Sequence, residues 1–280
     1  MTAADYSDRL LVLPLLSVLA LAGPACATGG SPAAGSAKLP GSQGYQALFR
    51  GQSEGPDGKT RFRLAVTLVP PDRLRLEFMG PVGGPRLVIA AGKDRAISLR
   101  PGERLYEQSA SPAGVLDGIL GVPLDAAGLV SLFMGRPMCP PEAVRVEVQT
   151  RPAATFGRTL SWYTVSCPPG DVRYQARCAE RGGALLSAVV REGITGAIIL
   201  EIEYGDYERG LGPRWPRQIH VRLPRREASV ELSAVEGPWA RNVPEEVVST
   251  AIPDGFRELT PGSSPDLQTL IGPGDANRDN

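Results

Sequence analysis

The sequence predicts a mainly β protein, a half-open antiparallel β-barrel of about eleven strands with a short α-helical lid. Between residues 44 and 232 most segments alternate apolar and polar residues with a period of two, which is typical of half-buried antiparallel strands. Short turns join these segments, without the crossover helices that a parallel sheet requires. Residues 111–135 instead have a helical period, and such short apolar helices need an apolar sheet face to lie on.

The bulk composition sets limits on size and partners. A chain of 280 residues can form one large or two small domains, and we favour one because β folds of this size are often single domains. The 30 basic and 30 acidic residues give no formal net charge, which argues against a nucleic-acid partner.

Motifs for catalysis are missing from the sequence. It contains no nucleophile elbow, phosphate-binding loop, dinucleotide fingerprint or zinc-protease helix, so we expect neither an enzyme nor a bound cofactor. His220, the only histidine, is on the polar side of its predicted strand and is expected to be a surface residue. Glu201 and Glu203 share one strand face, where solvated carboxylates are more common than a catalytic pair.

The N-terminus indicates export. Residues 10–23 form an apolar run too short for a membrane span, followed by Pro24, Ala25, Cys26 and Ala27. Ala25-Cys26-Ala27 fits the A-x-A cleavage rule of ordinary secretion, whereas residues 21–26 resemble a bacterial lipobox in which the Cys26 thiol is acylated. We favour the lipobox, because a cysteine at the end of the apolar run otherwise has little reason to be there. Residues 1–26 are then a lipoprotein signal peptide, and 27–43 a flexible linker.

The first strands give the candidate interior. From Gly44 the chain alternates, and residues 61–69 and 73–79 each place apolar side chains on one face and charged ones on the other. Residues 80–85 are a Gly/Pro-rich tip, and strands 86–91 and 96–99 follow. The inward sets of the first two strands are Phe62, Leu64, Val66, Leu74, Leu76 and Phe78.

Two helices are expected next. Ser111 is a candidate N-cap with Pro112 at the first helical position, and Gly121 ends this helix. Asp125 caps a second helix that stops at Gly135. The apolar faces include Val115, Ile119, Leu129 and Phe133.

The second half returns to strands, at residues 144–148, 159–166, 172–177, 183–191, 195–204, 219–223 and 230–232. Residues 244–250 predict a short helical turn. We therefore expect one domain over 44–260 and a disordered tail over 261–280. In an oxidising compartment Cys139, Cys167 and Cys178 allow one disulfide and one free thiol, and the sequence leaves the pairing open. Without a C-x-x-C pair or a second histidine, a zinc site lacks ligands.

Residues 74–83 (LRLEFMGPVG) resemble the strand and tip of the LolB family of outer-membrane lipoprotein receptors. The order continues as in that family, with Tyr106, then residues 120–124 (LGVPL) and 133–137 (FMGRP). The resemblance covers about residues 44–137, and beyond them only the strand pattern matches.

This resemblance implies a barrel with a lid and an apolar cavity, and we expect the protein to be a monomer. Such a protein takes the acyl chains of lipoproteins from a periplasmic LolA-like carrier and delivers them to the outer-membrane bilayer. The tip residues Pro81, Val82 and Gly83 would contact that bilayer, with Val82 at the position of an exposed leucine. Ala27 after the lipobox implies lipid anchoring at the periplasmic face of the outer membrane.

Two alternatives stay open. The ten predicted lining residues would also be expected in a close-packed core. A structural envelope lipoprotein that binds a protein partner without transferring lipid is therefore the second functional hypothesis. The predicted lining residues are Phe62, Leu64, Val66, Leu74, Leu76, Phe78, Val115, Ile119, Leu129 and Phe133.

Overall fold

The computed structural model describes residues 43–56, 58–80, 83–109, 124–138, 145–152, 159–166, 172–179, 184–207 and 215–259. In residues 145–152, 159–166, 172–173 and 177–179 the backbone alone is described. The predicted signal peptide, first lid helix and tail lie outside these ranges, as does the predicted linker except for Gln43, which begins the first strand. Also outside these ranges are Cys26, Pro81, Val82, Val115, Ile119, Cys139 and Cys167.

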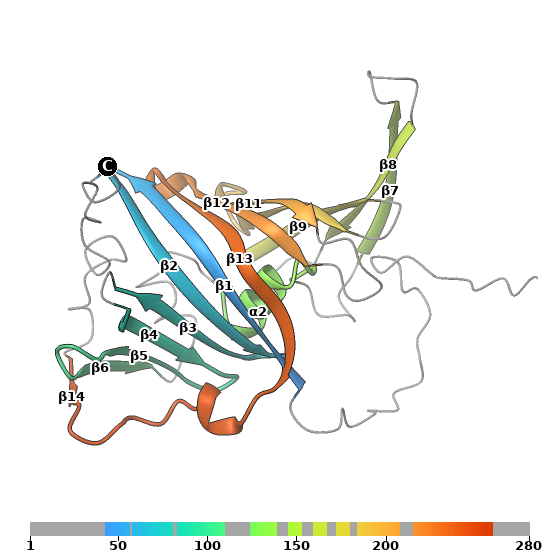
Figure 1. Ribbon diagram of the computed structural model, residues 1–280. Coiled ribbons are helices and arrows are strands. Elements are labelled where there is room, and N and C mark those ends of the chain that lie inside the picture. The colour runs from blue at the N-terminus through green and yellow to red at the C-terminus, as the bar shows by residue number, and fades with distance from the viewer. Residues whose placement is uncertain are drawn as a thin grey trace, which may run out of the picture.

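Within these ranges fourteen strands form one open sheet, which confirms the predicted fold class (Figure 1). Neighbouring strands are antiparallel, except that β14 is parallel to β6. The strand order is β14-β6-β5-β4-β3-β2-β1-β13-β12-β11-β10-β9-β8-β7. The bounds are β1 Gln43–Gly55, β2 Gly58–Val69, β3 Arg73–Met79, β4 Pro85–Ala91, β5 Ala96–Arg100, β6 Leu105–Ser109, β7 Arg145–Pro152, β8 Thr159–Ser166, β9 Val172–Ala179, β10 Leu185–Glu192, β11 Ile198–Tyr207, β12 Pro216–Leu223, β13 Ala228–Asn242 and β14 Arg257–Glu258.

The two halves of the sheet meet where β1 pairs with β13. Figure 1 shows the sheet curving so that the helix α2 (Ala126–Phe133) lies between the two halves. The concave face is apolar, and α2 packs into the same buried cluster as strands from both halves. Among the described residues no helix is long and apolar enough to cross a bilayer.

Strands β2 and β3 have the predicted alternation, with buried apolar residues toward the core. Strands β4 and β5 are buried on both faces. Their second face forms a separate cluster of Val88, Ala90, Ile97 and Leu99, against which Phe256 of the C-terminal segment packs. That segment then adds β14 to the edge of the sheet, so both faces of this corner are covered.

Helix α2 begins and ends where the sequence predicts. The Asp125 side chain accepts a 2.7 Å hydrogen bond from the backbone N–H of Gly128, as an N-cap does. The chain leaves the helix through Gly135, whose φ of +59° favours glycine. The predicted helical turn near residue 245 is also present, as the 3₁₀ helix η3 (Glu245–Val248).

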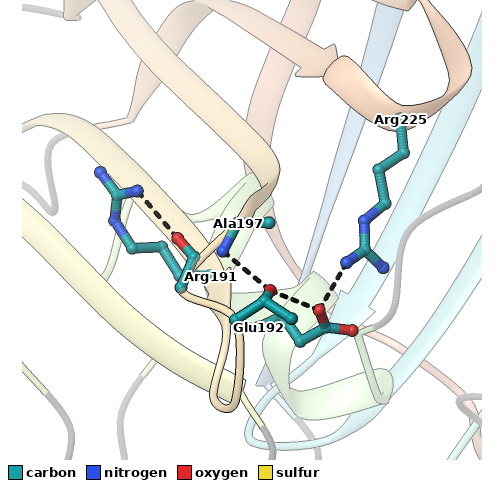
Figure 2. A network of polar contacts seen from close by, with 6 residues as sticks. Arg191, Glu192, Ala197 and Arg225 are labelled. Carbon is teal, nitrogen blue, oxygen red and sulfur yellow. Dashed lines mark hydrogen bonds and ion pairs between the residues drawn. The ribbon is translucent and has the colours of Figure 1, made fainter.

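The turn between β10 and β11 is longer than predicted, so the strand expected from residue 195 begins only at Ile198. Figure 2 shows the polar contacts that hold this turn. The Thr195 hydroxyl donates to the Glu192 carboxylate at 2.6 Å and accepts from the Ala197 N–H at 3.1 Å. Arg225, in the 3₁₀ helix η2 (Pro224–Arg226), donates to the same carboxylate at 2.7 Å. These bonds from Thr195 and Arg225 lower the pKa of Glu192.

Other boundaries differ from the predictions. Strand β13 extends far beyond residues 230–232, because it pairs with β1 from Ser229 to Asn242. The sequence did not predict β6 or the two-residue β14, since neither has a regular apolar pattern. Cys178 lies opposite Tyr163 of β8 and Leu185 of β10 in the backbone register.

Candidate functional site

The structure brings eight of the ten predicted lining residues into one buried cluster on the concave face. They come from β2, β3 and α2, and each is at most 6% exposed. The other two, Val115 and Ile119, lie outside the described residues. The eight residues are Phe62, Leu64, Val66, Leu74, Leu76, Phe78, Leu129 and Phe133.

The strand register explains why these residues meet. Leu64 lies opposite Phe78, and Val66 opposite Leu76, so the inward positions form rows across β2 and β3. Aromatic rings then join the layers. The ring centroids of Phe62 and Phe78 are 5.5 Å apart. Those of Phe49 on β1 and Phe133 on α2 are 5.9 Å apart, which fixes α2 against the sheet.

The second half of the sheet supplies an equal share of the concave face, and the sequence analysis did not place it there. The alternation of Leu200, Ile202 and Tyr204 in β11 was a visible signal, but only the curvature shows that it faces α2. The further cluster members from β9 to β12 are Tyr174, Ala176, Leu185, Ala188, Val190, Leu200, Ile202, Tyr204, Ile219, Val221 and Leu223, with Trp215 just before β12.

Three tyrosines introduce polar groups into this apolar surface. The Tyr207 hydroxyl donates to the backbone carbonyl of Leu185. The hydroxyls of Tyr174 and Tyr204 are buried and have no hydrogen-bond partner among the described residues. Burial raises the pKa of all three phenols. The Met138 backbone lies near enough to Tyr174 to offset part of that rise in pKa, without the geometry of a hydrogen bond.

A buried cation lies in the other half of the sheet. Arg100 is the last residue of β5. It follows Ala96 by four positions, so the two side chains share one face of the strand, the face of Ala96 in the main core. Its Nη1 is 3.9 Å from the Glu103 carboxylate. Its Nε and Nη2 have no hydrogen-bond partner among the described residues, so its charge is only weakly compensated there.

The described lining side chains are closely covered, since each is at most 6% exposed. A cavity of about 10 Å³ lies beside Phe49, Val66, Phe133 and Trp215. That volume holds at most about one water molecule and is far too small for an acyl chain. A ligand on the concave face would therefore have to displace α2 or other side chains.

Two turns project from one end of the sheet. Antiparallel pairing puts the β3–β4 tip and the β10–β11 turn at the same end, because β3 and β10 both run toward it. Of the predicted tip, only Gly83 is described, and it is exposed with a φ of +92°. In the other turn Ile194 is 92% exposed, a position that the sequence analysis did not select.

In strands β11 to β13 the convex face carries polar residues. Glu201 forms an ion pair with Arg222 at 3.1 Å, which gives it a structural role. Glu203, His220 and Glu231 lie in register across three strands and line a groove of about 320 Å³. His220 is half-buried rather than fully exposed. Within the described ranges, no three His, Cys, Asp or Glu residues are placed to hold a metal ion.

Comparison with known proteins identifies the fold. No protein-family model and no curated protein matches the sequence. A solved LolA superfamily protein from Nitrosomonas europaea matches with a TM-score of 0.53 and 10% identity, covering 75% of this chain and 91% of that one. A "putative outer membrane lipoprotein-sorting protein domain" from Vibrio parahaemolyticus matches with 0.54 and 11%, covering 75% and 90%. A DUF1329 family protein from Desulfovibrio piger matches with 0.56 and 10%, covering 76% and 91%.

These identities are too low to indicate more than architecture. They do not distinguish the LolB family, to which the sequence resemblance pointed, from other proteins with this sheet. The chain has a LolA-like fold, a curved and open antiparallel sheet with a short helix on its concave face.

Proposed function

We propose that this protein binds the acyl chains of lipoproteins or lipids on its concave face and helps to localise lipoproteins to the outer membrane. The observation that carries the proposal is the continuous apolar surface that both halves of the sheet and α2 build together. Solved proteins with the same fold include a LolA superfamily protein and a putative lipoprotein-sorting domain. Such a role requires no bond to be made or broken.

Binding would be driven by transfer of the acyl chain out of water, at about 0.8 kcal/mol for each buried methylene. Because the described lining side chains are already buried, the ligand must first displace the groups that cover them, α2 among them. Helix α2 has only eight residues and is marginally stable without tertiary contacts. The opening cost would keep the affinity moderate, as a protein that releases its cargo needs.

The more specific proposal is a LolB-like receptor. Cys26 would carry the lipid anchor, and a periplasmic LolA-like carrier would supply the cargo to the monomer. Pro81, Val82 and Gly83 would touch the bilayer at the periplasmic face of the outer membrane. Ile194 supports this orientation, because a fully exposed aliphatic side chain at the same end of the sheet gains by entering a membrane.

A second candidate function is favoured by the close burial of the described lining residues. A close-packed sheet suits a structural envelope lipoprotein that binds another protein through its loops. Such a protein would keep its concave face closed and would not bind acyl chains.

A binding assay separates the two functions. A fluorescent fatty acid is titrated into the Cys26→Ser protein, and a triacylated lipopeptide is added as competitor. Lipid handling predicts saturable binding that the lipopeptide displaces. If the fatty acid does not bind, or if the lipopeptide leaves it in place, the lipid-binding function is wrong.

A matched pair of valines locates the site. Val66 is 2% exposed on the concave face, and Val88 is 1% exposed in the separate cluster under Phe256. Val66→Ala should weaken fatty-acid binding about threefold to tenfold, because about two methyl contacts are lost. Val88→Ala removes the same two methyl groups from the other cluster. It should lower the free energy of unfolding about as much as Val66→Ala does, but leave the affinity for the fatty acid unchanged. Equal effects of both variants on affinity would place the ligand elsewhere.

Two cellular experiments test the specific proposal. Depletion of the protein should cause lipoproteins to accumulate before they reach the outer membrane. The mature protein should partition into a detergent phase, and Cys26→Ser should abolish this partitioning. A normal lipoprotein distribution after depletion would contradict the sorting role.

A further inference from the structure

Two tyrosine hydroxyls on the apolar surface, those of Tyr174 and Tyr204, are buried and have no hydrogen-bond partner within the described ranges. Tyr174 is 6% exposed and Tyr204 is 8% exposed, so neither hydroxyl reaches bulk water easily. A buried hydroxyl without a hydrogen bond costs about 1–3 kcal/mol relative to a satisfied one. Phenylalanine would fill the same space without that cost, so a group that arrives later is the natural partner for these hydroxyls.

The neighbouring Tyr207 shows that a phenol on the same surface can find a hydrogen-bond partner within the protein. Its hydroxyl donates to the Leu185 carbonyl, and Gly135 makes room for it. A Cβ at Gly135 would lie 3.0 Å from the Tyr207 oxygen and 3.0 Å from Cδ of Pro216. Tyr207 therefore adjoins the chain just after α2, and Tyr174 lies near the Met138 backbone in the same segment, which would move if the concave face opened.

The protonation state of the Tyr174 and Tyr204 phenols indicates which chemical groups they can bind. Burial raises the pKa of Tyr174 and of Tyr204, and for Tyr204 the charges that Tyr174 and Tyr207 would carry raise it further. Both phenols thus stay neutral and remain hydrogen-bond donors at any ordinary pH. As neutral donors, the two phenols suit an acceptor that carries no charge, such as a carbonyl oxygen. An anionic group would suit Arg100, in the other half of the sheet.

We propose that the hydroxyls of Tyr204 and Tyr174 donate hydrogen bonds to ester or amide carbonyl oxygens at the head of a bound acyl chain. The site would then select acyl groups over hydrocarbon chains of the same length. This inference rests on the proposed lipid-binding function and adds the chemical group that the concave face recognises.

A pair of lipids that differ only in their carbonyl groups provides the test. A diacylglycerol and its di-O-alkyl ether analogue of equal chain length each compete with the fluorescent fatty acid for the Cys26→Ser protein. The ester should compete about threefold to tenfold better, the effect of a net hydrogen bond of about 1 kcal/mol. In Tyr204→Phe and Tyr174→Phe this preference should shrink or vanish, while the ether competes as before.

Ligand-free stability gives an independent readout, with Tyr207→Phe as the control. Tyr204→Phe should unfold at the same or a higher temperature, because it removes a hydroxyl without a partner. Tyr207→Phe should unfold at a lower temperature, since the Leu185 carbonyl loses its donor, and should keep the ester preference.

The possible failures are distinguishable. If ester and ether compete equally in the unchanged protein, the carbonyl site is wrong although lipid binding stands. If Tyr204→Phe loses stability and keeps the preference, the hydroxyl serves an internal water or protein partner, and the inference is again wrong. If neither lipid competes and the fatty acid itself does not bind, the proposed function fails.

Discussion

Gly51 lies in β1, and the ring of Phe62 on β2 occupies the space where its side chain would be. The two residues are register partners, and a Cβ at Gly51 would lie 2.2 Å from Cε2 of Phe62. The ring is itself buried between this glycine and Phe78. Glycine is therefore required for packing, since any side chain would displace a core aromatic ring.

Gly51→Ala should lower the free energy of unfolding by about 1–3 kcal/mol, the usual cost of overpacking a core. The measurement is urea denaturation followed by circular dichroism. Gly102→Ala is the control, because no atom lies within 4 Å of its Cβ and the change should be within about 0.5 kcal/mol. Equal stability of the two variants would mean that the Phe62 ring can move aside freely.

For single residues, the sequence predicted burial more accurately than it predicted contacts. The period of two was enough to select Phe62, Leu64 and Leu76, because alternation depends only on the local backbone. It could not show that Gly51 supports a ring, which depends on register. Nor could it separate Tyr204 from an ordinary core residue, because the partner of a hydroxyl is set by distant strands.

Helix α2 has no acidic residue in its first turn and no basic residue in its last, so no charged side chain inside the helix interacts favourably with its dipole. Asp125 is thus the main polar contribution to its start, through the bond to Gly128. The remaining stability comes from the buried Leu129, Leu132 and Phe133. Weakening the cap should make the helix easier to detach.

Asp125→Ala should lower the free energy of unfolding by about 0.5–2 kcal/mol, and Asp125→Asn should retain most of the stability. Thermal denaturation of the two variants is the measurement. If α2 must move for lipid to enter, Asp125→Ala should also bind the fluorescent fatty acid faster. Identical stability of the alanine and asparagine variants would exclude a capping role.

Element ends were predictable where one residue decides them, as Asp125 and Gly135 do for α2. The start of β11 was not, because the Thr195 hydroxyl and Arg225 extend the turn through contacts that a strand pattern cannot reveal. The two-residue β14 forms only because the C-terminal segment passes β6. Its sequence alone carries no strand signal.

The curved sheet buries three tyrosines, and burial opposes the ionisation of their phenols. Burial raises the pKa of Tyr174, Tyr204 and Tyr207, whereas in the unfolded chain each phenol titrates near about 10. Above that pH the unfolded state loses protons that the folded state keeps. The stability from these groups is therefore complete below about pH 10 and is lost as the pH rises toward their folded values.

We expect the ultraviolet absorbance of tyrosinate to rise in two steps during alkaline titration. Tyr174, Tyr204 and Tyr207 should contribute only to the second step, which should coincide with loss of the folded circular dichroism signal. Tyr204→Phe should reduce the second step by about one tyrosine. A single smooth titration that is complete while the protein remains folded would contradict the burial of these phenols.

At the scale of the molecule, the sequence predicted the class of fold and the concave apolar face, because both depend on patterning. It did not predict that β1 and β13 would pair or that strands β9 to β12 would face α2. Both features depend on pairing between strands that are far apart in the sequence, and the alternation within one strand does not determine its partner. The comparisons supply the architecture and leave the cargo to experiment.

The β1–β13 pairing also determines how this protein must fold. Apart from β14, each half of the sheet is a meander of strands that are consecutive in the sequence, but the β1–β13 pairing joins Gln43 to Asn242. As the chain emerges in order, β1 keeps an open edge until residues beyond 228 are made. Pairing across such a sequence distance is slow, and an unpaired edge invites association with other chains. Formation of the β1–β13 pair is the step at which folding competes with aggregation, and the step that a chaperone would have to protect.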